Sequence, residues 1–148
     1  MPRDIHEIKA DFAALTESDF DLSNEESDGM EQLNNLTDEL QELDQPSEVA
    51  ETILEFIERL GECDLGSPGP LVHRLEKLPN YEEHLYRSVA RKPTPLTMWM
   101  VNRILNAMED SGKRETLLLL VRQSLTHCLA SAQTKQEAKH FIDYQARA

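Results

Sequence analysis

The side chains of this sequence that could perform catalysis or bind a metal are 28 acidic residues, five histidines and two cysteines. No pair of histidines shows the HExxH pattern or a comparable spacing, which places two zinc ligands on one face of a helix. Cys63 and Cys128 are too few for a disulfide framework, and we expect each to be a small core residue rather than a nucleophile. The sequence therefore predicts no metal site and no cofactor.

Carboxylates are frequent, but none forms a motif of a known catalytic or ligand-binding type. The acidic segment 19–26 (DFDLSNEE) lacks the glycine and the ligand spacing of an EF-hand loop. The segment 66–70 (GSPGP) contains two prolines, which cannot donate N–H groups to a phosphate, so it predicts a corner of the chain. Because nothing singles out a catalytic pair among the acids, the sequence predicts a protein that is not an enzyme.

Net charge is the strongest feature of the composition, because 15 basic against 28 acidic residues give −13. This charge argues against direct binding of nucleic acid, whose phosphates need a cationic partner, and against an anionic membrane surface. The charge is also uneven: residues 1–62 carry 19 acids and three bases, and residues 63–148 carry nine acids and twelve bases. The asymmetry indicates a surface for a basic partner, although solvated acidic helices give the same pattern.

Apolar segments of the sequence are short. No stretch approaches the roughly 18 apolar residues that span a bilayer, and the longest uninterrupted run covers residues 117–121. Residues 1–7 lack the apolar core of a signal peptide. We therefore expect a cytoplasmic protein without a membrane partner.

Apolar residues recur at helical spacing along most of the sequence, and no segment alternates as a β-strand does. Short connections favour antiparallel neighbours, so we expect an all-α chain of about eight antiparallel helices in a single domain, residues 1–148. Both a short α-solenoid of the HEAT-like type and a compact helical bundle fit this pattern. We expect the acidic segment 1–29 to be less ordered. The expected helices cover residues 4–17, 30–43, 47–61, 70–78, 81–91, 95–109 and 112–130, with a polar loop over 18–28.

The segment 112–130 is the most apolar of these helices, with seven large aliphatic residues from Leu117 to Leu129. A helix that is apolar on most sides is covered by neighbours on several sides. We therefore expect this helix to lie centrally, followed by a turn and by a final helix that Thr134 caps.

The helix expected over residues 47–61 is strongly amphipathic, with an apolar stripe about half a turn away from a stripe of glutamates. The apolar stripe consists of Val49, Ile53, Phe56, Ile57 and Leu60. The glutamates repel one another at i,i+4 spacing, which a helix tolerates for solubility and which also suits a cationic partner. We take six acids here as candidate partner-binding residues: Glu48, Glu51, Glu55, Glu58, Glu62 and Asp64.

A second candidate surface surrounds the only tryptophan, Trp99. In the helix expected over 95–109, Asn102, Arg103 and Asn106 follow Trp99 at i+3, i+4 and i+7, so all four share one side. A tryptophan among arginine and amide side chains is typical of a binding hot spot. The alternative is that Trp99 packs under the next helix with its indole N–H bonded to an asparagine.

Four short segments of the middle of the chain carry a family resemblance. They are residues 66–73 (GSPGPLVH), 81–83 (YEE), 91–94 (RKPT) and 99–103 (WMVNR). They resemble the small helical immunity proteins of bacterial polymorphic-toxin loci, including those of contact-dependent growth inhibition systems. The resemblance covers roughly residues 45–145 and leaves out the acidic segment before them.

This resemblance implies a binding protein that neutralises a cognate toxin domain in the cytoplasm. Many such toxins are nucleases, whose substrate grooves are basic because they hold phosphates. An acidic helical protein would occlude such a groove as a monomer in a one-to-one complex, without contacting nucleic acid itself. The alternative is a non-catalytic α-helical scaffold or adaptor for another basic protein.

Overall fold

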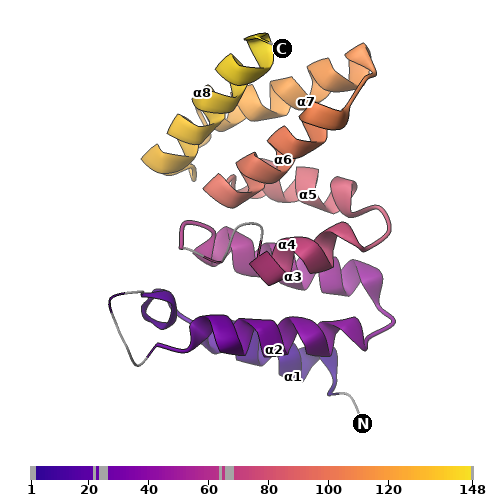
Figure 1. Cartoon of the computed structure of the whole chain (residues 1–148), viewed down its shortest axis with the longest axis vertical. Coiled ribbons are helices and arrows are strands. Elements are labelled where there is room, and N and C mark those ends of the chain that lie inside the picture. The colour runs from indigo at the N-terminus through magenta and orange to yellow at the C-terminus, as the bar shows by residue number, and fades with distance from the viewer. Residues whose placement is uncertain (1–2, 22, 24–26, 64, 66–68, 148) are drawn as a thin grey trace. The chain divides into compact units, whose positions relative to one another are not determined.

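The chain folds into helices in the computed structural model, which describes residues 3–21, 23, 27–63, 65 and 69–147 (Figure 1). These residues form eight α-helices and one short 3₁₀ helix without any strand, which confirms the all-α class. No helix in the described part of the chain is both long enough and apolar enough to cross a membrane. The elements are α1 (Ile5–Ala14), η1 (Glu17–Phe20), α2 (Gly29–Gln41), α3 (Pro46–Leu60), α4 (Gly69–Glu76), α5 (Tyr81–Arg91), α6 (Pro95–Ala107), α7 (Ser111–Ser124) and α8 (Ala132–Arg147).

The chain, expected to be one helical domain, divides into two compact units, residues 1–84 and 85–148, and α5 contributes to both. The first unit holds 23 acidic and five basic residues, a formal charge of −18. The second unit holds five acidic and ten basic residues, a formal charge of +5. The charge asymmetry of the sequence therefore follows the division into units.

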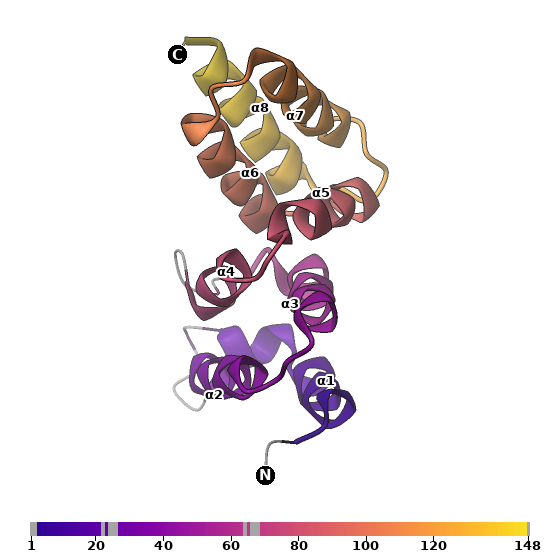
Figure 2. The same ribbon diagram turned by 90° about the vertical axis from the view of Figure 1, so that its right-hand side faces the viewer.

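In the first unit, two pairs of helices pack on each other, α1 with α2 and α3 with α4 (Figure 2). α1 also contacts α3, and α2 contacts α4, so each helix of one pair meets a helix of the other. Each of these four helices therefore packs against two of the others. The largest fully buried side chains of this unit are Ile8, Leu33, Leu40, Ile53, Leu54, Ile57, Leu71 and Leu75.

The structure confirms the expected amphipathic helix over residues 47–61 as α3. It begins at Pro46, because proline suits the first turn of a helix, where its missing N–H costs nothing. All five residues of the predicted apolar stripe are buried. Ala50, Thr52 and Leu54 are buried as well, because α3 packs against both α1 and α4. The exposed side of α3 is therefore narrower than the sequence predicts.

The prediction of a polar loop over residues 18–28 is wrong for its first residues, which belong to η1. A capping box begins it: the backbone N–H of Thr16 donates to the Asp19 carboxylate at 2.8 Å. Phe20 at its end is buried and meets the ring of Phe56 edge to face, with centroids 6.1 Å apart. This aromatic contact joins the turn to the core.

In the second unit, α6, α7 and α8 pack against one another. The expectation that the leucine-rich segment 112–130 is covered on several sides is wrong, because α7 ends at Ser124 and buries only Leu117, Val121 and Ser124. On another side of α7, Leu119 is 52% exposed. A run of leucines puts an apolar residue on every side of a helix. These residues are buried only on the sides where another helix packs.

The turn after α7 is held by side-chain hydrogen bonds. Nε2 of His127 lies 2.8 Å from the carbonyl oxygen of Ala90, and Nδ1 of His127 accepts the backbone N–H of Leu129 at 3.0 Å. The residue that caps α8 is Ser131, whose Oγ accepts the backbone N–H of Thr134 at 3.0 Å. Thr134 is itself buried, so the predicted role of Thr134 as the cap is wrong.

A partly exposed ion pair joins Arg3, just before α1, to Glu39 on α2 and predicts a pH-dependent stability. Arg3 donates to both carboxylate oxygens of Glu39, at 2.8 and 2.7 Å, and these bonds hold the pKa of Glu39 below its usual range. Because the pKa of Glu39 is lower in the folded state than in the unfolded state, the pair stabilises the fold fully at pH values above the unfolded pKa. This stabilisation is lost as the pH falls through the folded pKa.

We therefore expect Glu39→Gln to lower the melting temperature at neutral pH, and the difference from the wild type to vanish at an acid pH below the folded pKa of Glu39. Thermal unfolding followed by circular dichroism at both pH values measures this. Asp38→Asn, at an exposed neighbouring position, is the control and should not lower the melting temperature. A Glu39→Gln defect of equal size at both pH values would contradict the electrostatic explanation.

Candidate partner-binding surfaces

The acidic stripe of α3 lies on the surface of the first unit, and the structure divides its residues into two groups. Glu48, Glu55 and Glu62 are exposed. Glu51 and Glu58 are half-buried and interact with other residues of the chain. Asp64, the sixth candidate, lies outside the described residues. The exposed glutamates at seven-residue spacing are the carboxylates that a partner reaches most easily.

Glu51 has a partner within the first unit. Its Oε1 lies 2.8 Å from Nδ1 of His84 on α5, and the His84 side chain is only 13% exposed. The pair joins α3 to the first turn of α5. Glu51 therefore contributes a contact within the fold, whether or not it also contacts a partner.

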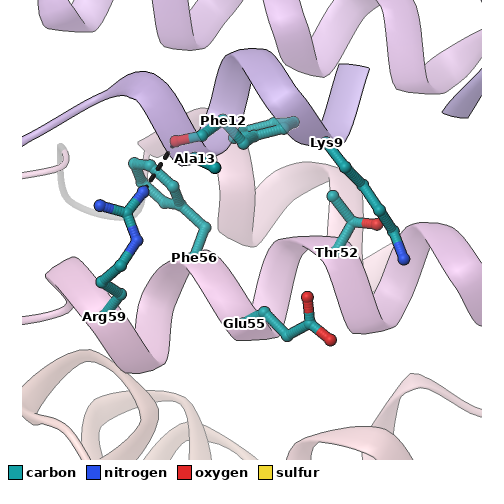
Figure 3. Close-up of a pocket in the computed structure, with 7 residues that line it drawn as sticks. All are labelled: Lys9, Phe12, Ala13, Thr52, Glu55, Phe56 and Arg59. Carbon is teal, nitrogen blue, oxygen red and sulfur yellow. Dashed lines mark hydrogen bonds between the residues drawn. The ribbon is translucent and has the colours of Figure 1, made fainter. Parts of the chain in front are cut away.

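A pocket of about 250 Å³ opens between α1 and α3, next to this stripe (Figure 3). Its buried residues are Phe12, Phe56 and Thr52, each at most 3% exposed, so two aromatic rings form its floor. The rings meet edge to face with centroids 5.4 Å apart. Its rim consists of the less buried residues Lys9, Ala13, Glu55 and Arg59.

Arg59 of α3 lines one end of this pocket and caps the C-terminal end of α1. Its guanidinium donates to the carbonyl oxygens of Phe12 and Leu15, both at 2.7 Å, which satisfies acceptors at the C-terminal end of the helix. The guanidinium carbon also lies 5.5 Å from the centre of the Phe56 ring, a cation–π distance. The charge of Arg59 is thus already engaged by the protein.

Lys9 and Glu55 form the rest of the charged rim. Lys9 lies at the opposite end of the pocket from Arg59, and Glu55 lies between them on α3 (Figure 3). No hydrogen bond or ion pair joins either side chain to another residue among those that the structure describes. The pocket therefore has an apolar floor and a free carboxylate on its rim, and this carboxylate belongs to the predicted acidic stripe.

The second candidate surface lies on α6, in the second unit. Arg103 is stacked on Trp99, with its guanidinium carbon 4.9 Å from the ring, and Trp99 is half-buried. Asn102 is buried, 9% exposed, while Asn106 is exposed. Trp99, Arg103 and Asn106 therefore lie at the surface, whereas Asn102, predicted on the same side, is buried against α8.

The two asparagines belong to a polar network that the sequence did not reveal. Nε2 of Gln145 on α8 donates to the side-chain oxygens of Asn102 at 2.7 Å and Asn106 at 2.9 Å. Arg114 of α7 donates to Oε1 of Gln145 at 2.9 Å and also to the carbonyl oxygen of Leu105 at the end of α6. This network joins α6, α7 and α8, which gives Asn102 a structural role independent of any partner.

The acidic stripe belongs to the first unit, and the surface around Trp99 belongs to the second. Lys9, Phe12 and Thr52 were not predicted as site residues, although they line the pocket with Glu55. No local signal marks them, because α1 and α3 come together only through their packing. Of the residues that the structure describes, no group of three or more His, Cys, Asp or Glu side chains could hold a metal ion.

The cysteines differ from the expectation that both are core residues. Cys128 is exposed, because it follows the end of α7, and Cys63 is half-buried. Burial and the nearby carboxylates of Glu17 and Glu62 raise the pKa of the Cys63 thiol. A raised pKa means less thiolate at neutral pH.

We therefore expect Cys63 to react with iodoacetamide several-fold more slowly than Cys128 near pH 7.5. Mass spectrometry of peptides from a timed labelling reaction measures both rates in one sample. In the unfolded chain, Cys63 should react faster than it does in the native protein. Equal rates at the two cysteines in the native protein would contradict the environment described for Cys63.

Comparison of the chain with protein-family models, with curated proteins and with solved structures finds no match.

Proposed function

We propose that this protein is a non-catalytic binding protein whose acidic first unit holds a basic protein partner. The observation that carries the proposal is the charge of −18 on residues 1–84. Three glutamates of that charge are exposed, Glu48 and Glu55 on α3 and Glu62 just after it. Clustered carboxylates speed the capture of a cationic partner and exclude acidic competitors.

The partner we propose is a toxin domain, most naturally a nuclease. The resemblance of four segments between residues 66 and 103 to immunity proteins of toxin loci suggests this class, and the charge fits it independently. A nuclease has a basic substrate groove, because phosphates must bind there. The acidic first unit would occupy that groove in a one-to-one complex in the cytoplasm, and the substrate would be excluded.

Co-expression with the cognate toxin tests this proposal. The candidate partner is the C-terminal domain encoded by the nearest large open reading frame upstream of the gene. We expect that domain to stop growth alone, and co-expression of this protein to restore growth and yield a stable complex. A toxic domain that neither binds this protein nor is neutralised by it would overturn the immunity function and leave the adaptor alternative.

A further inference from the structure

We propose that the pocket between α1 and α3 receives one large apolar side chain of the basic partner, and that Glu55 pairs with a cation beside that side chain. The inference rests on the proposed function, because it names how the acidic unit recognises its partner. It would make the Phe12–Phe56 floor the packing anchor of the complex. Glu55 on its rim, and the exposed glutamates before and after it in sequence, would then provide attraction and orientation.

The size and lining of the pocket favour a single side chain. Small-molecule sites usually measure about 300–1,000 Å³, and this pocket measures about 250 Å³. Its floor is made by two phenylalanine rings that are each at most 3% exposed. Hot spots of protein interfaces combine such an apolar depression with one anchoring side chain, while nearby polar contacts exclude water.

The charges around the pocket decide which side chain fits. A cation is disfavoured inside it, because Arg59 already lies 5.5 Å from the Phe56 ring and Lys9 stands at the other end. An anion is disfavoured because Glu55 lies on the rim and the unit as a whole is strongly acidic. A neutral apolar side chain such as phenylalanine or leucine avoids both repulsions and gains the burial energy.

The surface beside the pocket is complementary to a basic one. Glu55 lies on the rim, and Glu48 lies two turns before it on the same side of α3. A cation next to the apolar anchor on the partner would reach Glu55, whose carboxylate has no partner among the described residues. The pocket and the predicted stripe therefore form one continuous recognition surface.

A pair of short basic peptides tests the pocket without knowledge of the natural partner. The probe is a blocked pentapeptide with phenylalanine between two pairs of lysines, and its control carries alanine at the centre. Titration into the ¹⁵N-labelled full chain, followed by NMR, gives both the affinity and the amides that shift. We expect the phenylalanine peptide to bind at least about fivefold more tightly and to shift Ala13, Thr52 and Phe56.

Two leucine substitutions on α1 provide matched variants. Ala13 lines the pocket and is exposed, so Ala13→Leu fills the pocket without disturbing the core. Ala10 is exposed on the same helix but does not line the pocket, so Ala10→Leu makes the same change elsewhere. We expect Ala13→Leu to abolish the preference for the phenylalanine peptide and Ala10→Leu to keep it.

The outcomes separate this inference from the proposed function. Equal affinities for the two peptides, or no shift at the pocket with either, would overturn the apolar anchor. A preference that survives Ala13→Leu would also overturn it. None of these results bears on growth rescue by co-expression, which decides the proposed function separately.

Discussion

Replacing Gln145 by alanine is expected to lower the free energy of unfolding by about 2 kcal/mol. The substitution removes the donor to Asn102 and Asn106 and the acceptor for Arg114. Asn102 is buried and would keep an unpaired oxygen, and a buried polar group without a partner costs about 1–3 kcal/mol. Urea unfolding followed by the fluorescence of Trp99, which lies in the same unit, measures the loss.

Gln136→Ala is the matched control for that experiment. Gln136 is exposed on the same helix, so the same chemical change there should alter stability by no more than about 0.5 kcal/mol. Similar stabilities for the two variants would mean that the polar network does not hold the second unit together. The packing of α6, α7 and α8 would then rest on their apolar contacts alone.

Reversing the charge of Glu48 and Glu55 together is expected to weaken the complex with the proposed toxin partner by about 100-fold at low salt. Both side chains are exposed, and lysine and glutamate have similar helix propensities, so the fold should persist. The reversed charges would face the cations of the partner, and such like-charge contacts cost several kcal/mol. Isothermal titration calorimetry measures the affinity, and circular dichroism checks the helical content.

The double variant Glu31→Lys and Asp38→Lys gives the same change in net charge on α2. Glu31 and Asp38 are also exposed and seven residues apart, and Glu31, like Glu48, lies in the first turn of its helix. We expect the α2 variant to weaken binding by less than about 10-fold, against about 100-fold for the α3 variant. Equal losses would show that only the total charge matters, and α3 would not be the binding surface.

The helices were predictable from the sequence because their signals are local. Apolar residues at 3.6-residue spacing marked α3, and the helix expected from residue 95 begins there as α6. The sequence did not predict which apolar residues are buried, because burial depends on the helices packed around them. Leu119 is as apolar as Leu117, but only Leu117 has a neighbouring helix to bury it.

The candidate site was predictable only in part, for the same reason. The glutamates of α3 follow from their spacing, and Glu48 and Glu55 are exposed as expected. The pocket beside them arises where Phe12 of α1 meets Phe56 of α3, a contact between residues 44 positions apart. No short-range pattern contains such a contact. The same holds for Gln145, whose partners lie on two other helices.

The most direct test of the central claim is a titration of the purified toxin domain with this protein at about 50 mM and about 500 mM salt. The proposed function predicts a one-to-one complex that weakens markedly at high salt, because the acidic first unit provides the attraction. An affinity that does not change with salt would contradict electrostatic recognition by this unit. Absence of binding by a folded, active toxin domain would contradict the proposed function itself.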